Sequence, residues 1–93
     1  MDVSFTWSEA KRHANLAKHR LDFLDVERVF GGETFTFEDR RFWYGEKRYI
    51  ALGLFHHTPV HIVHTIHDQE IRIISFRKAT RREAQTYFEE VAY

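Results

Sequence analysis

The sequence predicts a small α+β domain with N-terminal helices, a four-stranded antiparallel meander sheet and a C-terminal helix. Two early segments repeat apolar residues at helical spacing, and the centre of the chain alternates apolar and polar residues as strands do. Thr80 and Glu83 then have the spacing of a helix capping box. With 93 residues, including nine Phe, four Tyr and two Trp, the chain can build one core but not two. We therefore expect a single domain, residues 1–93.

The N-terminal third is expected to hold a short extended segment and two helices. Residues 3–7 form either a short strand or an extended entry, after which Ser8 can cap a helix. That helix covers residues 9–19 and ends in cations, as the helix dipole prefers. A second, shorter helix begins at Asp22 and ends where Gly31 and Gly32 interrupt its apolar stripe.

Four strands and a last helix follow. The expected strands are residues 34–37, 47–55, 60–67 and 70–77. Their connections are a loop through residues 39–45, a turn at 56–59 and a tight reversal at 68–69. The capping box then predicts a strand end near Lys78 and a helix from Arg81 to about Val91.

The register expected for the last hairpin separates two faces of the sheet. A two-residue turn pairs His67 with Glu70, and continuing the ladder pairs Val63 with Ile74. The first face then holds His61, Val63, Thr65, His67, Glu70, Arg72, Ile74 and Phe76. The second face holds Val60, Ile62, His64, Ile66, Ile71, Ile73 and Ser75. Because the second face is more apolar, we expect it to hold the helices.

Charged side chains are expected to gather at one end of the first face. Extending the register to the preceding strand adds its own charged residues to that end. The resulting group is Glu46, Arg48, His67, Glu70 and Arg72. A mixture of acids, bases and an imidazole suits general acid–base chemistry on a phosphodiester. A ladder of surface salt bridges explains the same pattern without any chemistry.

The strand-to-helix segment is rich in cations. Its members are Arg72, Arg77, Lys78, Arg81 and Arg82, and we expect them around one end of the sheet, where they suit phosphate binding. The ring of Phe76 is expected on the same exposed surface. A solvated strand-to-helix corner is the alternative reading.

Other features narrow the class of protein. Zero formal net charge means that local rather than global fields attract any charged ligand. The absence of Cys excludes disulfides and thiolate chemistry. His61, His64 and His67 are three apart, which aligns them in neither a strand nor a helix, so no metal site and no cofactor are expected. His64 is expected to be a hydrogen-bonded core residue.

Neither a signal peptide nor a membrane-spanning run is apparent, so we expect a cytoplasmic protein without membrane contact.

Three groups of residues resemble BrnT-type toxins. They are Trp7-Ser8-Glu9-Ala10-Lys11 with Asn15, Lys18-His19 and Phe23; Tyr44-Gly45-Glu46-x-Arg48 with Ala51-Leu52-Gly53; and His64-Thr65, then Arg72-Ile73-Ile74-Ser75-x-Arg77-Lys78-Ala79-Thr80-x-x-Glu83 with Tyr87. The resemblance covers nearly the whole chain. The departures are Arg20 in place of a usual Gly, Phe76 in place of a small residue, and Ile66-His67 in place of a polar pair.

The resemblance implies a RelE-like fold and a ribonuclease toxin of a type II toxin–antitoxin pair. Such a toxin cleaves RNA without a metal ion and thereby inhibits translation. It is neutralised by a BrnA-type antitoxin with a ribbon-helix-helix part, and it reaches operator DNA only through that antitoxin.

A metal-free ribonuclease needs a base, cations that stabilise the phosphorane, and an acid. We assign Arg48 and Arg72 to phosphate stabilisation, with either Glu46 or His67 as the base. The candidates for RNA binding or the acid role are Lys18, His19, Arg77 and Lys78. If Arg77 faces the helical side, it instead anchors a helix end. The competing class is a non-enzymatic module that binds nucleic acid or an acidic protein; an acid within reach of the arginines favours the enzyme.

Overall fold

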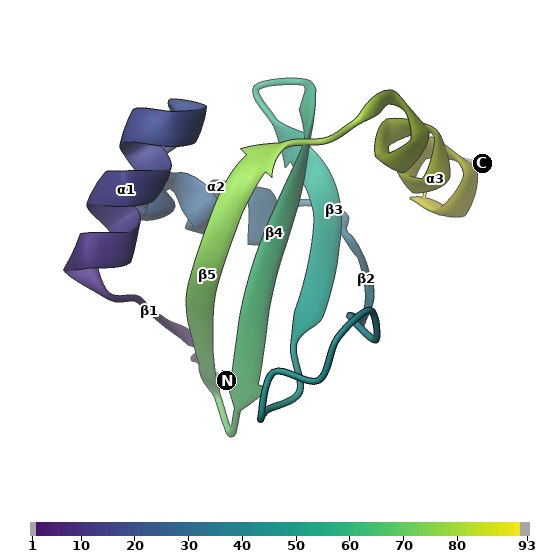
Figure 1. Cartoon of the computed structure of the whole chain (residues 1–93). Coiled ribbons are helices and arrows are strands. Elements are labelled where there is room, and N and C mark those ends of the chain that lie inside the picture. Colours follow the sequence, from purple (N-terminus) through teal and green to yellow (C-terminus); the bar gives the residue numbers. More distant parts are fainter. Residues whose placement is uncertain (1, 92–93) are drawn as a thin grey trace.

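The computed structural model describes residues 2–91 as one five-stranded sheet with helices around it (Figure 1). Residues 1, 92 and 93 of the expected domain lie outside the described part. The elements are β1 (Ser4–Thr6), α1 (Glu9–His19), the 3-10 turn η1 (Phe23–Asp25), α2 (Val26–Phe30), β2 (Phe35–Glu38), β3 (Tyr49–Phe55), β4 (Thr58–His67), β5 (Glu70–Lys78) and α3 (Arg81–Val91). Within residues 2–91, no helix is long and apolar enough to cross a membrane.

The sheet is mixed, with the strand order β1-β5-β4-β3-β2. The antiparallel meander of β2 to β5 confirms the expected order of strands. The short strand expected as one alternative for residues 3–7 is present as β1, but it pairs in parallel with β5, from Ser4 opposite Glu70 to Thr6 opposite Arg72, so the expected sheet of four antiparallel strands was wrong. A three-residue strand whose partner lies more than sixty positions away leaves no turn signal in the sequence.

Local signals placed the helices well. The bounds of α1 and α3 are the expected ones, and the second short helix begins as η1 before it continues as α2. The capping box is formed: the Glu83 N–H donates to Thr80 Oγ1 at 3.2 Å, and the Thr80 N–H donates to Glu83 Oε1 at 2.9 Å. The β3–β4 turn is tighter than expected, because His56 and His57 both adopt positive φ and β4 already begins at Thr58.

A β-bulge in β5 changes the expected register. The pairs His67–Glu70 and Thr65–Arg72 are confirmed, but Val63 lies opposite Ser75 rather than Ile74. The extra residue moves Ser75 to the first face and Phe76 to the apolar face, where its ring is fully buried. The expectation of an exposed Phe76 was therefore wrong, and burial of that ring favours the bulged register.

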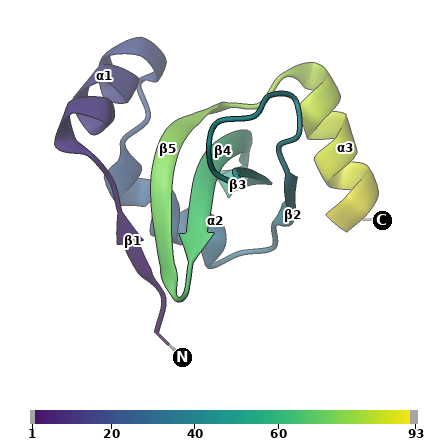
Figure 2. The same ribbon diagram turned by 60° about the horizontal axis from the view of Figure 1, so that its bottom comes forward.

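Helices cover both faces of the sheet rather than one (Figure 2). η1 and α2 pack on the apolar face, in a core of Phe23, Val26, Val29, Ala51, Val60, Ile62, Ile73 and Phe76. The approach of α2 needs Gly53, because a Cβ there would lie 2.7 Å from Val29 Cγ1. α3 packs on the first face, where Tyr87 contacts Ile50 and Leu52. The expectation that the apolar face holds the helices thus fails for α3, because the first face is itself apolar around Ile50 and Leu52.

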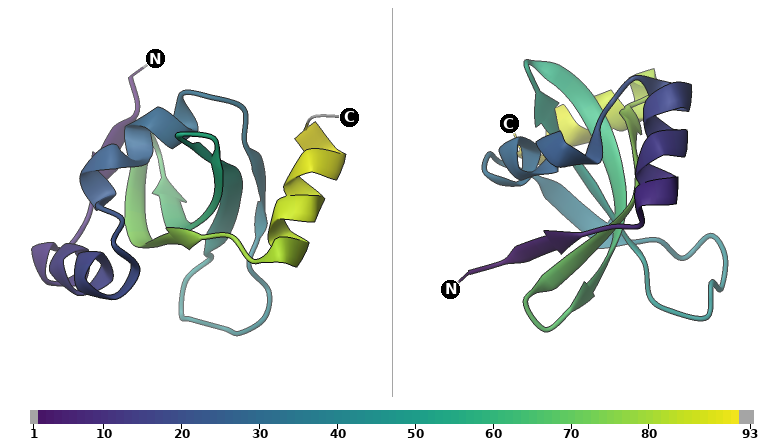
Figure 3. Two further views of the ribbon diagram at one scale, coloured as in Figure 1. Left: turned by 90° about the horizontal axis from the view of Figure 1, so that it is seen from above. Right: turned by 90° about the vertical axis from the view of Figure 1, so that its left-hand side faces the viewer.

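α1 completes the edge of β5 beyond β1 (Figure 3). The Asn15 side chain accepts from the Phe76 N–H at 3.1 Å and donates to the Phe76 carbonyl at 2.8 Å. It also donates to the Leu21 carbonyl at 3.1 Å. An amide side chain thus supplies the two backbone hydrogen bonds that a further strand would have made.

Candidate active site

One end of the first face remains uncovered, and a carboxylate lies there between two arginines. Arg72 Nη2 donates to both carboxylate oxygens of Glu46, at 2.7 and 2.9 Å. Arg48 Nε donates to Glu46 Oε2 at 3.3 Å. The side chains of Arg72, Glu46 and Arg48 are 41%, 37% and 23% exposed, so the group is open to a ligand in solution. The expected convergence of these three residues is confirmed.

Two different segments position this group. Arg72 lies in β5 opposite Thr65, between the β4–β5 turn and the bulge. The register of this part of the hairpin sets the face on which its side chain lies. Arg48 precedes β3, and its carbonyl accepts from the Asp39 N–H at 2.7 Å. The Arg48 guanidinium also lies 4.2 Å from the centre of the Tyr44 ring, a cation–π contact that limits its movement.

Asp39 organises the loop that carries Glu46. Its buried carboxylate accepts from Arg41 Nε at 2.8 Å, from Arg41 Nη2 at 2.9 Å and from the Tyr44 hydroxyl at 3.1 Å. The hydrogen bonds from Arg41 lower the pKa of Asp39 to about 2, and that from Tyr44 acts in the same direction. The sequence analysis did not single out Asp39; a lone acid at the start of a loop carries no pattern that marks it as buried.

Two expected members of the group stand apart from it. His67 ends β4 on the same face, but its side chain is 90% exposed and its Nε2 lies 3.6 Å from Asp68 Oδ2. Glu70 accepts from the Thr6 hydroxyl at 3.2 Å, so it joins β1 to β5. Of the two expected candidates for the base, the structure therefore brings Glu46, and not His67, to the arginines.

The RNA-binding candidates lie at the opposite end of β5. Lys18 and His19 end α1, where burial and the charges of Lys18 and Arg77 lower the pKa of His19. Arg77 donates to Glu83 through Nη1 at 2.9 Å and Nη2 at 3.0 Å, and to the Lys78 carbonyl at 3.0 Å. The alternative that Arg77 anchors a helix end is thus confirmed in its geometry. Lys78 itself is exposed.

A buried histidine that the sequence analysis left out of the site lies beside Arg77 and Glu83. His61 pairs with Arg77 in the β4–β5 ladder and is 2% exposed. Its Nε2 is 3.6 Å from Glu83 Oε2, and its Nδ1 has no hydrogen-bond partner among the described residues. Burial lowers the pKa of His61 and Arg77 lowers it further, against the opposing effect of Glu83. The expected register, which lacked the bulge, places His61 opposite Phe76, so no sequence signal linked His61 to Arg77.

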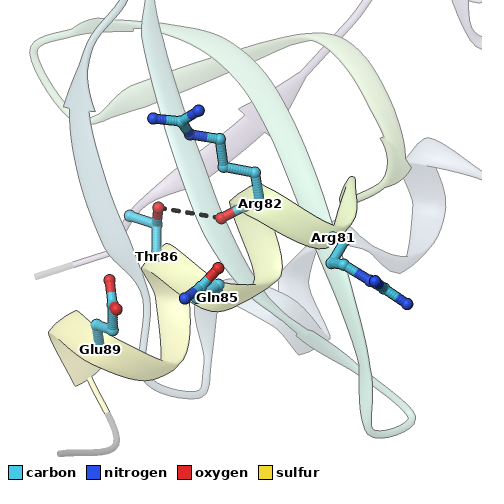
Figure 4. A pocket seen from close by; sticks show the side chains of 5 residues that line it. All are labelled: Arg81, Arg82, Gln85, Thr86 and Glu89. Carbon is cyan, nitrogen blue, oxygen red and sulfur yellow. Dashed lines mark hydrogen bonds between the residues drawn. The ribbon is translucent and has the colours of Figure 1, made fainter.

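The expected gathering of five cations at one sheet end was wrong. Arg72 and Lys78 are six residues apart on one extended strand, or about 20 Å. Arg81 and Arg82 belong to α3 and point in different directions (Figure 4). They line a broad depression of about 490 Å³ together with Gln85, Thr86 and Glu89. The cations are thus divided between two ends of the sheet and the outer surface of a helix.

The histidines do not form a metal site. His64 is buried, its Nδ1 lies 3.3 Å from the Ile62 carbonyl, and Phe30 and Tyr49 flank its ring, which confirms it as a core residue. His56 and His57 are exposed in the turn. Across residues 2–91, no three His, Asp or Glu side chains come together as metal ligands. Whether cleavage needs an added metal stays a prediction for experiment.

The fold and this open group define a small α+β protein with an exposed carboxylate between two arginines at one end of its sheet. Residues 7–83 match the family described as the ribonuclease toxin BrnT of type II toxin–antitoxin systems, and the chain therefore belongs to the BrnT family. Its structure is similar to the 1.1 Å crystal structure of the Brucella abortus ribonuclease toxin BrnT, with 26% sequence identity and a TM-score of 0.63. That likeness covers 86% of this chain and 100% of the Brucella chain. No curated protein matches the sequence significantly.

Proposed function

We propose that this chain is a cytoplasmic endoribonuclease toxin that cleaves RNA without a metal ion at Glu46, Arg48 and Arg72, and so inhibits translation. The observation that carries the proposal is a carboxylate 2.7 to 3.3 Å from two arginines, at the end of the sheet that α3 leaves open. Membership of a ribonuclease toxin family supports the same activity. An acid placed among the cations favours this enzyme over a binding module that uses cations alone.

Cleavage proceeds by attack of the ribose 2′-oxygen on the adjacent phosphorus and departure of the 5′-oxygen. Glu46 takes the 2′-hydroxyl proton, and a water molecule returns a proton to the leaving oxygen, because the acid candidates Lys18, His19, Arg77 and Lys78 lie at the other end of β5. Arg48 and Arg72 stabilise the negative charge that grows on the phosphorane. Because both arginines already donate to a carboxylate, an incoming phosphate finds donors that are oriented before it binds.

His67 is the second candidate for proton transfer. It belongs to the pair next to Thr65–Arg72 on the same face, and its exposed ring is free to turn toward a bound ribose. We assign the base to Glu46, because Glu46 already touches both arginines. Replacement of Glu46 by Gln should therefore lower the cleavage rate far more than replacement of His67 by Gln. Equal losses, or a larger loss for His67→Gln, would move the base to the histidine.

A second group of side chains, at the other end of β5, binds the RNA away from the reacting phosphate. Lys18, His19 and Lys78 are the candidates, while Arg77 is engaged by Glu83. RNA that contacts both ends runs along about 20 Å of β5. Binding of this kind weakens as salt rises, since phosphate contacts release counterions.

Metal independence is tested by incubating the purified protein with total RNA in excess EDTA. We expect new RNA ends at the same rate with and without the chelator. RNA that stays intact at every protein concentration would refute the enzyme, whereas cleavage that appears only after added Mg²⁺ or Mn²⁺ would refute the mechanism alone.

The expected partner is a BrnA-type antitoxin with a ribbon-helix-helix part, through which alone the toxin reaches operator DNA. Family membership in a type II system implies an antitoxin. A complex stable enough to copurify should bury well over ~1,000 Å², and added salt should slow its association more than it speeds release. The chain is coexpressed with the adjacent reading frame, followed by size exclusion and an RNA assay. A chain that elutes alone, or a complex that cleaves like the free chain, contradicts inhibition.

A further inference from the structure

Two large aromatic side chains stand in solvent beside the candidate active site. Phe42 and Trp43 are 68% and 78% exposed, the highest values among the exposed large apolar residues of the described chain. Both belong to the loop between β2 and β3, which projects from the sheet (Figure 3). Exposed apolar surface of this size costs solvation free energy and points to a binding role.

The loop is held in one shape although its tip is exposed. Asp39 ties its beginning to its middle through Arg41 and Tyr44. The Phe42 ring packs edge-on against Tyr44, with ring centres 5.9 Å apart. The aromatic pair is therefore presented by an ordered support, which lowers the entropy cost of binding.

Trp43 and the proposed catalytic carboxylate line the same cavity. Its volume is about 210 Å³, and its lining includes Phe42, Trp43, Glu46 and Lys47. Pockets for drug-sized ligands are larger, roughly 300–1,000 Å³, so this one fits a single flat ring system better than a folded segment. The reacting phosphate of RNA, placed at Arg48 and Arg72, puts a neighbouring base at this cavity.

We propose that Phe42 and Trp43 form a stacking platform for an unpaired base next to the scissile phosphate, so that the toxin selects single-stranded RNA. The location of that phosphate rests on the proposed function. Bases in a duplex already stack on each other, whereas an unpaired base offers its π face to an aromatic side chain. The exposed ammonium of Lys47, beside the cavity, adds attraction for the RNA backbone.

The two tryptophans allow a direct binding test. Trp7 donates to Glu9 at 2.7 Å and packs edge-on against Phe23, at the core on the apolar face of the sheet. The Trp7→Phe chain therefore reports on Trp43 alone, and the Trp43→Phe chain reports on Trp7 alone. Both are titrated with a labelled 2′-O-methyl oligonucleotide, which binds like RNA but lacks the attacking hydroxyl, and with its duplex. Anisotropy of the label measures binding, and tryptophan emission measures stacking.

We expect the single strand to quench Trp43 emission to saturation, the duplex to quench it little, and Trp7 emission to stay constant. Trp43→Ala should weaken single-strand binding roughly tenfold or more, whereas Trp43→Phe should keep most of the parental affinity. Leu24→Ala, an exposed apolar control on η1, should bind like the parent. Bound oligonucleotide without quenching, equal affinity of Trp43→Ala and parent, or no oligonucleotide binding would overturn the platform. Trp43 emission that responds to the antitoxin but not to the oligonucleotide would also overturn it and assign the loop to the protein partner.

This result is independent of catalysis. A chain that cleaves no RNA, either in EDTA or with added Mg²⁺, but shows Trp43 quenching refutes the proposed activity and leaves base stacking on Trp43 standing. A chain that cleaves RNA while Trp43→Ala keeps the parental rate and affinity refutes the platform alone.

Discussion

The first face of the sheet carries two Arg–Glu pairs at opposite ends of β5, and their surroundings differ. Arg77 donates two hydrogen bonds to Glu83, with His61 buried beneath and the N-terminus of α3 above. Arg72 donates two hydrogen bonds to Glu46, with Arg48 beside them, at the end of β5 that lies away from α3 (Figure 1). The side chains of the first pair are 26% and 27% exposed, and those of the second are 41% and 37% exposed.

The comparison shows that pairing alone does not decide the role of an arginine. The Arg77–Glu83 pair closes a helix start, because Glu83 also accepts from the Thr80 N–H. The Arg72–Glu46 pair joins the β2–β3 loop to β5 but caps no helix in the described chain, and its donors remain within reach of a ligand. We therefore infer that one pair stabilises the fold and that the other binds the phosphate.

The largest expected effect on cleavage comes from the Arg72–Glu46 pair, the open pair, and from Arg48 beside it. Arg72→Ala and Arg48→Ala should each lower the RNA cleavage rate roughly a hundredfold or more, because each removes a donor to the developing oxyanion. The free energy of unfolding should change by no more than about 1 kcal/mol, since partly exposed ion pairs contribute little to stability. Cleavage assays and urea unfolding of the same preparations measure both quantities. Variants that are folded and fully active would remove these residues from the site.

The Arg77–Glu83 pair, the closed pair, should show the reverse pattern, with a larger effect on stability than on cleavage. Arg77→Ala should lower the free energy of unfolding by about 1–3 kcal/mol, because it takes two charge-assisted hydrogen bonds from Glu83. The cleavage rate of the folded fraction should fall by only a few-fold. Arg81→Ala, at the exposed first residue of α3, is the matched control and should change neither quantity. A collapse of activity in a stable Arg77→Ala chain would break the comparison.

Acidification should lower the free energy of unfolding in two steps. Burial lowers the pKa of His61 and His64 below their usual 6.5, so the unfolded chain takes up protons first and the free energy of unfolding falls below about pH 6.5. Hydrogen bonds from Arg77 and Thr80 outweigh the effect of burial and lower the pKa of Glu83 to about 2. Its contribution is therefore present above about pH 4.5 and lost as the pH falls toward 2.

The histidine step is measured by urea unfolding at pH 7.5 and pH 5.5. The parent chain should lose stability between the two, and the His64→Gln chain should lose less, whatever its absolute stability. His13→Gln, whose ring is 71% exposed, is the control that keeps the parental difference. An unchanged difference in His64→Gln would argue against the buried neutral ring.

The smallest expected effect lies at the end of α1, outside both pairs. Arg20 is the C-cap residue, with a φ of 62° in the left-handed region that Gly adopts without strain. Arg20→Gly should raise the free energy of unfolding by about 1 kcal/mol or less and leave cleavage unchanged. A destabilised Arg20→Gly chain would show that the arginine makes a contact that outweighs its backbone strain.

Local sequence patterns predicted most of the fold, and contacts between residues far apart in the sequence accounted for the errors. Caps and apolar spacing placed α1 and α3 at their observed bounds, because these signals act within a few residues. The parallel strand β1 and the bulge that buries Phe76 depend on contacts across the chain, which no local pattern encodes. For the same reason the sequence predicted Glu46, Arg48 and Arg72 together, on the tip side of the bulge, and missed the corner of His61 and Glu83 beyond it.

The most direct test of the central claim is an NMR titration of the arginine side-chain N–H groups with an uncleavable 2′-O-methyl oligonucleotide. Assigned Nε–H signals of Arg48, Arg72 and Arg77 are followed in one experiment. We expect the Arg48 and Arg72 signals to shift with the oligonucleotide concentration and the Arg77 signal to stay in place. A shift confined to Arg77, or binding that leaves Arg48 and Arg72 unmoved, would contradict the assignment of the open pair to the phosphate.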